Sequence, residues 1–192
     1  MRCPKDPSKY DKYVDGVLLS AYHYNGKQLA NKLRLSKKYI RRADIGVIAS
    51  LSRSNILQGG YTKPDQALSP QRIYQKAILC AALGVKRFGL WPGRLIDGAF
   101  YVSLGKATRL IWGHEKFYYD GLNVHDQVSV RSANSTKWGA FAYTAQQHKG
   151  KRLISLFNFL DKPLQLKVHM KGSSWVKSYT LPAHGVKLIK IK

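Results

Sequence analysis

Acidic residues are scarce in this sequence of 192 residues. Only 10 residues are Asp or Glu, against 33 Lys and Arg, and Glu115 is the single glutamate. The formal net charge is +23. A surface this positive attracts polyanions, which keeps polyanion binding among the hypotheses for its function.

Metal-binding and cofactor motifs are also missing. The two cysteines, Cys3 and Cys80, form no CxxC pair and have no histidine nearby. This excludes a zinc site and a disulfide framework, and we expect both to be free thiols. The six histidines include no HExxH pattern, and the chain has no P-loop and no GxGxxG. We therefore expect no cofactor and no bound metal.

Long apolar segments are absent as well. No stretch approaches the roughly 20 apolar residues of a membrane helix, so no membrane partner is expected. The polar start, Met1–Asp6, shows no secretory signal, and if Met1 is the true start the expected location is the cytoplasm. Hydrophobic residues still make up 44% of the chain and aromatic residues 11%, enough to bury one medium core or two small ones.

Apolar runs alternate with helical patterns in the first half of the chain. The runs predict strands buried on both faces, at 14–22, 44–50 and 85–91. Helices are expected between them and after the third, at 26–42, from Pro70 to Gly84, and after Asp97. Ser69 followed by Pro70 is a strong helix start. The order β-α-β-α-β-α predicts a parallel sheet with right-handed crossovers.

After about Trp112 the hydrophobic period changes to two. Leu164, Leu166, Val168 and Met170 alternate with polar residues, as in a sheet with one wet face. Further strands are expected at 124–130, 138–144, 152–160, 175–180 and 186–191. We therefore predict two domains, an α/β segment at 1–112 and an antiparallel β domain at 113–192.

Three local phrases carry a resemblance to a known group of enzymes. They are VDGVLLSAY at 14–22, GLWPG at 89–93 followed by Asp97-Gly98, and WGHEKFYYDG at 112–121. They resemble the C-terminal portion of a (β/α)8-barrel glycoside hydrolase with its accessory β domain, and the closing 181–189 is similar to the last strand of such domains. The resemblance implies an α/β plus all-β fold: a partial (β/α) barrel of the last three βα units, then a small antiparallel β-sandwich-like domain.

Three βα units are fewer than the eight of a closed barrel. An isolated chain would leave sheet edges exposed. We therefore expect a fragment or a remnant of a longer enzyme, which needs a longer chain or self-association to cover those edges.

The resemblance implies a carbohydrate site at the carboxyl ends of the strands, where the loops of a barrel gather. The candidate substrate-binding residues there are Tyr22, His23, Tyr24, Trp91, Arg94 and Asp97. The aromatic rings could stack on sugars and the polar side chains could bind hydroxyls. In the alternative reading, Trp91 caps the barrel core, the tyrosines pack on neighbouring helices, and Asp97 only caps its helix.

A pair of catalytic carboxyl groups is not visible. Glycoside hydrolysis needs two that face each other, and the predicted strand ends offer only Asp97. Asp15 lies within the first predicted strand and Asp44 at the start of the second, the wrong end for barrel chemistry, and Glu115 and Asp120 follow the last helix. The catalytic residues are therefore unknown. We expect a glycoside hydrolase-like fragment that contributes carbohydrate contacts and is inactive alone.

The charge supports two other hypotheses. Residues 27–42 contain seven basic residues and no acid, and 149–192 contain ten with only Asp161 against them. Either segment could make the chain a polyanion (nucleic-acid) binding module that contacts phosphates with little sequence preference. Diffuse charge is equally typical of an inactive structural remnant. Aromatic residues gathered in one concavity would favour sugar binding, and a contiguous basic face elsewhere would favour polyanions.

Overall fold

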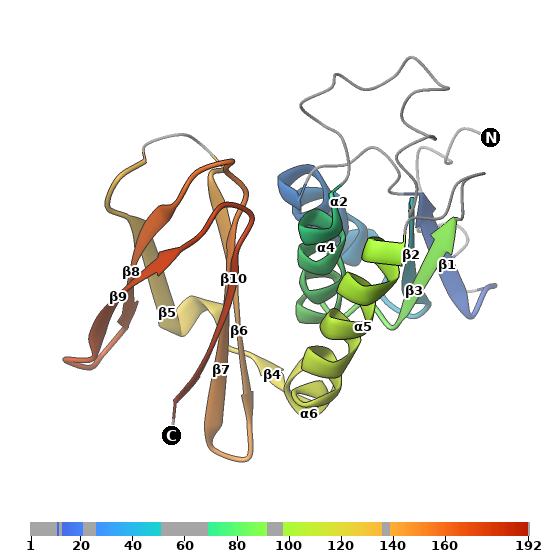
Figure 1. The fold of residues 1–192 in the computed structure, drawn as a ribbon. Coiled ribbons are helices and arrows are strands. Elements are labelled where there is room, and N and C mark those ends of the chain that lie inside the picture. Colours follow the sequence, from blue (N-terminus) through green and yellow to red (C-terminus); the bar gives the residue numbers. More distant parts are fainter. Residues whose placement is uncertain are drawn as a thin grey trace. The chain divides into compact units, whose positions relative to one another are not determined.

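The computed structural model describes residues 11, 13–20, 26–50, 69–91, 98–135 and 139–191 (Figure 1). The chain forms two compact units, Met1–Thr108 and Arg109–Lys192. The first contains a parallel sheet with helices and the second contains antiparallel sheets. The predicted change from βα alternation to antiparallel strands is confirmed. Among the described helices, none is both long enough and apolar enough to cross a membrane.

The N-terminal unit contains a three-stranded sheet in the order β1-β2-β3. Its strands are β1 (Gly16–Ser20), β2 (Asp44–Ser50) and β3 (Arg87–Trp91). Both pairings are parallel, with Leu19 opposite Val47 and Val47 opposite Phe88. The sheet is therefore the parallel one that the alternating order predicted.

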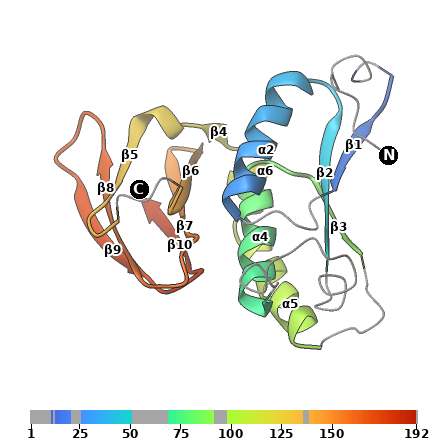
Figure 2. The same ribbon diagram turned by 90° about the horizontal axis from the view of Figure 1, so that it is seen from above.

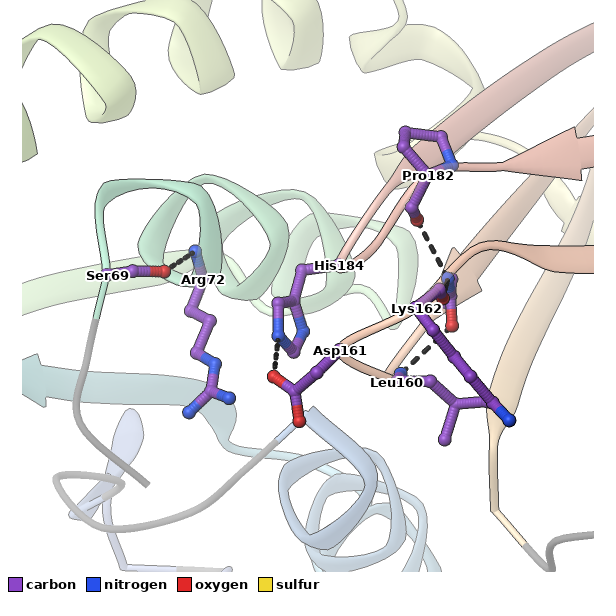
Figure 3. Close-up of polar contacts among 8 residues, drawn as sticks. Ser69, Arg72, Leu160, Asp161, Lys162, Pro182 and His184 are labelled. Carbon is purple, nitrogen blue, oxygen red and sulfur yellow. Dashed lines mark hydrogen bonds and ion pairs between the residues drawn. The ribbon is translucent and has the colours of Figure 1, made fainter. Parts of the chain in front are cut away.

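Helices cover one face of this sheet, as Figure 2 shows. They are α2 (Gly26–Tyr39), α4 (Pro70–Ala82) and α5 (Gly98–Trp112). The predicted start of α4 is confirmed, because the Ser69 hydroxyl accepts a 3.2 Å hydrogen bond from the Arg72 N–H (Figure 3). The predicted end is confirmed too: Gly84 follows with φ +71°, a conformation that glycine adopts without strain.

The two faces of the parallel sheet differ in burial. Leu19 and Val47 are buried, and Phe88 packs against a small core formed by Ile73 and Phe100. On the other face Leu18 is 56% exposed, although it is a large apolar residue in the middle of a strand.

Helix α4 buries a lysine together with its apolar residues. Lys76 is only 4% exposed, and burial lowers the pKa of its ammonium group to about 8. One turn later, burial raises the pKa of the Cys80 thiol to about 12. Keeping a positive charge at Lys76 in the folded protein therefore costs stability at neutral pH.

We expect Lys76→Met to stabilise the protein by about 2 to 3 kcal/mol at pH 7, since a depressed lysine pKa is a penalty on the folded state. Below pH 8 the lysine is protonated in both states, so the penalty is complete. Between pH 8 and the ordinary value of 10.5, the unfolded chain binds more protons, and the free energy of unfolding of the parent rises with pH.

Urea unfolding of both proteins from pH 6 to pH 10.5 checks this. Their difference should be constant up to pH 8 and then shrink. Deprotonation of Cys80 on unfolding lowers both stabilities above pH 9 and largely cancels in the difference. A difference that does not change with pH would contradict a lowered pKa of Lys76 in the folded protein.

The C-terminal unit begins with a short helix and then forms two antiparallel sheets. The short elements are α6 (Glu115–Tyr119), β4 (Leu122–Asn123) and the 3-10 turn η2 (His125–Gln127). One sheet has the order β10-β7-β6-β4, with β6 (Phe141–His148), β7 (Lys151–Asn158) and β10 (Val186–Ile191). The other has the order β5-β8-β9, with β5 (Val128–Ser132), β8 (Leu164–Met170) and β9 (Val176–Leu181).

Both sheets contribute to one hydrophobic core. Ile154 and Leu156 come from the first sheet, and Leu166 and Val168 from the second. The predicted alternation along β8 is confirmed: Leu164, Leu166, Val168 and Met170 are buried, while Gln165 and Lys167 are exposed. A two-residue turn with positive φ at Lys149 and Gly150 joins β6 to β7, which suits the twist of a tight hairpin.

The stretch between the two halves differs from the prediction. A strand was expected at 124–130, but β5 starts only at Val128. The Asn123 side chain accepts a 3.0 Å hydrogen bond from the His125 N–H and so favours a turn there. Helix α6 was not predicted, because five residues are too few to show a helical period. Strand β6 also runs further than expected, to His148, because β7 pairs with it along its whole length.

A buried asparagine joins two loops of the C-terminal unit. The Asn158 amide donates to the carbonyl oxygens of Lys162 at 2.8 Å and Pro182 at 2.7 Å, and its own oxygen accepts from the Leu160 N–H at 2.9 Å (Figure 3). Nearby, His184 Nε2 lies 2.7 Å from a carboxylate oxygen of Asp161 (Figure 3). These contacts hold the 159–163 loop against the turn at 182–185.

Candidate functional site

The carboxyl ends of the three parallel strands meet at one edge of the sheet. Ser20 of β1 pairs with Ile48, and Ser50 of β2 pairs with Trp91 of β3. The connections after β1, β2 and β3 therefore leave from the same edge. This is where open and closed parallel sheets place their ligands.

The predicted sugar-binding residues follow these strand ends in the sequence. Five of them lie outside the described residues: Tyr22, His23, Tyr24, Arg94 and Asp97. Trp91 is the last residue of β3 and its backbone pairs with Ser50, but its side chain lies outside the described part. The assignment of these six residues therefore stays a prediction.

Described carboxylates lie at the opposite, amino-terminal edge of the sheet. Asp44 pairs with Gly16 at the start of β2, and its carboxylate forms a 3.0 Å ion pair with Lys86. Asp15 precedes β1, and its carbonyl accepts a 2.9 Å hydrogen bond from the Asp44 N–H. Asp44 is thus at the start of its strand, as predicted, whereas Asp15 was expected within its strand and precedes it.

The third described carboxylate of this unit is structural. The Asp11 carboxylate accepts hydrogen bonds of 2.7 to 3.1 Å from the N–H groups of Arg41, Arg42 and Ala43. These bonds, that from Ala43 above all, lower the pKa of Asp11. The loop before β2 is thereby fastened to the residues before β1. In the described part of the N-terminal unit, no carboxylate lies at the carboxyl edge of the sheet.

A hollow of about 400 Å³ lies in the C-terminal unit, between segments that no sequence motif links. One wall comes from the end of α5 and from α6, and the other from the turn between β6 and β7. The lining residues are Trp112, Gly113, His114, Glu115, Lys116, Phe117, His148, Lys149 and Lys151. We refer to it as the α6 hollow. Its two walls are about thirty residues apart in the sequence, so no local motif could have revealed it.

Two histidines shape the α6 hollow. His114 Nδ1 donates a 2.8 Å hydrogen bond to the Leu110 carbonyl oxygen, which orients its ring at the end of α5. The His148 ring meets the Phe117 ring edge to face, with 6.1 Å between the centroids. The Nε2 atom of His148 is covered and has no hydrogen-bond partner among the described residues. Among the described residues, those of the hollow included, no group of three or more potential metal ligands occurs.

Comparison with known proteins gives a clear likeness of fold. No protein-family model and no curated protein sequence matches this chain. An α-amylase from Geobacillus thermoleovorans, solved with acarbose, matches 98% of this chain and 52% of its own, with 12% identity and a TM-score of 0.62. An α-amylase from H. orenii matches 96% of this chain and 51% of its own, with 12% identity and a TM-score of 0.56. AmyP, solved with maltose, matches 85% of this chain and 44% of its own, with 11% identity and a TM-score of 0.54.

These matches confirm, at the level of fold, the resemblance to part of a glycoside hydrolase. The chain spans about half the length of the solved structures that it matches.

Proposed function

We propose that this chain is the C-terminal part of a glycoside hydrolase of the α-amylase type, which contributes carbohydrate contacts but lacks the catalytic carboxylate pair. The observation that carries the proposal is the fold shared with α-amylases over nearly the whole chain and half of theirs. In this reading residues 1–112 are the last three βα units of a barrel and 113–192 are the accessory β domain. Helix α5 runs without interruption to Trp112, which favours that boundary.

The exposed face of the parallel sheet supports an incomplete barrel. A barrel interior is filled by side chains from all eight strands. Here Leu18 is exposed on the face without helices, and in the described sheet β1 and β3 each have one partner. The remaining strands would cover Leu18 and both edges, and they would supply the catalytic carboxylates.

Ligands of the similar structures suggest the class of sugar. AmyP was solved with maltose and, as its E221Q variant, with maltotriose, and the Geobacillus thermoleovorans α-amylase was solved with acarbose. For this chain we propose short α-glucans as ligands at the carboxyl edge of the sheet. Tyr22, Tyr24 and Trp91 would stack on the sugar rings, while His23, Arg94 and Asp97 would bind the hydroxyls.

Titration calorimetry with maltotriose tests this proposal. We expect binding with a dissociation constant of about 1 mM, typical of a few stacking and hydrogen-bond contacts, and about tenfold weaker binding by Trp91→Ala. Tyr101→Ala, which removes an exposed ring from α5, should leave the affinity unchanged. The chain alone should release no reducing sugar from starch. Measurable hydrolysis would contradict the missing carboxylate pair, and absence of maltotriose binding would contradict the carbohydrate role.

Basic helix α2 favours a second candidate function, polyanion binding. Lys32, Arg34 and Lys38 are exposed on it, and it has no acidic residue in its first turn. Such a helix binds phosphates or sulfates by releasing counterions. Affinity for a DNA oligonucleotide should then fall steeply with salt and show little preference for sequence. Changing these three residues to serine should reduce the slope of log affinity against log salt by about 2 to 3.

A further inference from the structure

We propose that the α6 hollow is a second binding site, separate from the strand ends, and that it takes an acidic saccharide: a sugar ring carrying a carboxylate or a phosphate. The saccharide class rests on the proposed function. The site itself rests on the hollow, its aromatic platform and its excess of positive charge.

The aromatic platform is Trp112. Its side chain is 73% exposed although it is among the largest apolar side chains in the protein. An indole ring left open at the edge of a hollow is a flat surface on which the C–H face of a sugar can lie. Phe117 also lines the hollow, and its ring meets that of His148, another lining residue, edge to face.

The charge around the platform is positive. Lys116 comes from α6, Lys149 from the β6–β7 turn and Lys151 from the start of β7, so both walls contribute lysines. Glu115 is the single carboxylate among the lining residues. A neutral sugar would offer these ammonium groups no anionic partner. A carboxylate or phosphate would form charge-assisted hydrogen bonds with them.

Size also fits a short saccharide. About 400 Å³ lies within the range of small-ligand sites and suits one or two sugar rings. One described platform and a short hollow do not provide the long track of stacking rings and phosphate contacts that a nucleic-acid strand uses. We therefore place a compact acidic ligand here rather than a nucleic acid.

Calorimetric titration of the 192-residue chain with trigalacturonate tests this site. Maltotriose, inorganic phosphate and a short DNA oligonucleotide serve as comparison ligands. We expect the affinity of this site for trigalacturonate to be at least about tenfold higher than its affinity for inorganic phosphate. Trp112→Ala should weaken trigalacturonate binding by about tenfold or more, because the stacked ring loses its platform. Trp112 is exposed, so the variant should fold like the parent.

A matched pair of triple variants separates the site from diffuse charge. Changing Lys116, Lys149 and Lys151 to serine removes the ammonium groups of the hollow and should weaken trigalacturonate by about tenfold or more. Changing Lys162, Lys167 and Lys171 to serine removes the same charge elsewhere in the unit and should change the affinity less than about twofold.

Three results would overturn the proposal. The two triple variants could lose trigalacturonate affinity equally, or the hollow could bind phosphate or DNA as tightly as trigalacturonate. The third is that Trp112→Ala leaves the trigalacturonate affinity unchanged. Maltotriose binding that depends on Trp91 belongs to the proposed function. It can fail or succeed independently of these results.

Discussion

Replacing Asn158 by aspartate is expected to destabilise the C-terminal unit by about 4 kcal/mol. The reason is that a carboxylate oxygen, which only accepts hydrogen bonds, replaces a buried amide donor that faces carbonyl oxygens. Asn158 is completely buried, and its amide faces the carbonyl oxygens of Lys162, Leu181 and Pro182. A carboxylate there is repelled by all three, and a protonated acid can satisfy only one. Both loops that the asparagine joins lose their attachment. The free energy of unfolding in urea, followed by near-ultraviolet circular dichroism, measures the loss.

The same substitution at Asn134 is a matched control. The Asn134 side chain is exposed, and its oxygen accepts a 3.0 Å hydrogen bond from the Gln165 N–H. Aspartate keeps that acceptor, so the stability should change by less than about 0.5 kcal/mol. Equal effects at the two positions would show that the direction of the Asn158 hydrogen bonds is unimportant, contrary to the structure.

Gly121→Ala is expected to cost about 3 kcal/mol, because the new methyl group would overlap backbone that cannot move independently. A Cβ atom at residue 121 would collide with the carbonyl oxygen of Phe117 and lie 3.0 Å from its carbonyl carbon. Relief requires the end of α6 to shift, and Phe117 shifts with it. Thermal unfolding measures the cost. If the proposal for the α6 hollow is correct, trigalacturonate affinity should fall as well, because Phe117 is one of the residues that line it.

Gly105→Ala tests whether the effect belongs to the position or to the substitution. Gly105 lies inside α5, and a Cβ atom there would meet nothing within 4 Å. Alanine is the better helix former, so this variant should be more stable than the parent by up to about 1 kcal/mol. Opposite signs for the two variants are the expected result. A loss at Gly105 similar to that at Gly121 would show that the cost comes from the substitution itself and not from the contact with Phe117.

Local signals in the sequence were sufficient for the N-terminal elements and for β8. Ser69 and Pro70 start α4, and Gly84 ends it, because capping depends on residues within one turn of each other. The alternation from Leu164 to Met170 fixes which face of β8 is buried, because successive side chains of a strand point to opposite faces. The resemblance to glycoside hydrolases also came from short phrases, and the shared fold confirms it.

Contacts between distant residues were decided only by the tertiary structure. The burial of Lys76 arises from what surrounds α4, and nothing in its own helix requires it. The role of Asn158 depends on carbonyl groups of Lys162 and Pro182, which the fold brings to it. The α6 hollow exists because the β6–β7 turn returns His148 to the side of Phe117. The sequence by itself determined the order and kind of the longer elements, since these depend on near neighbours, but not the short helix α6 or the turn before β5. The sites depend on which elements pack together.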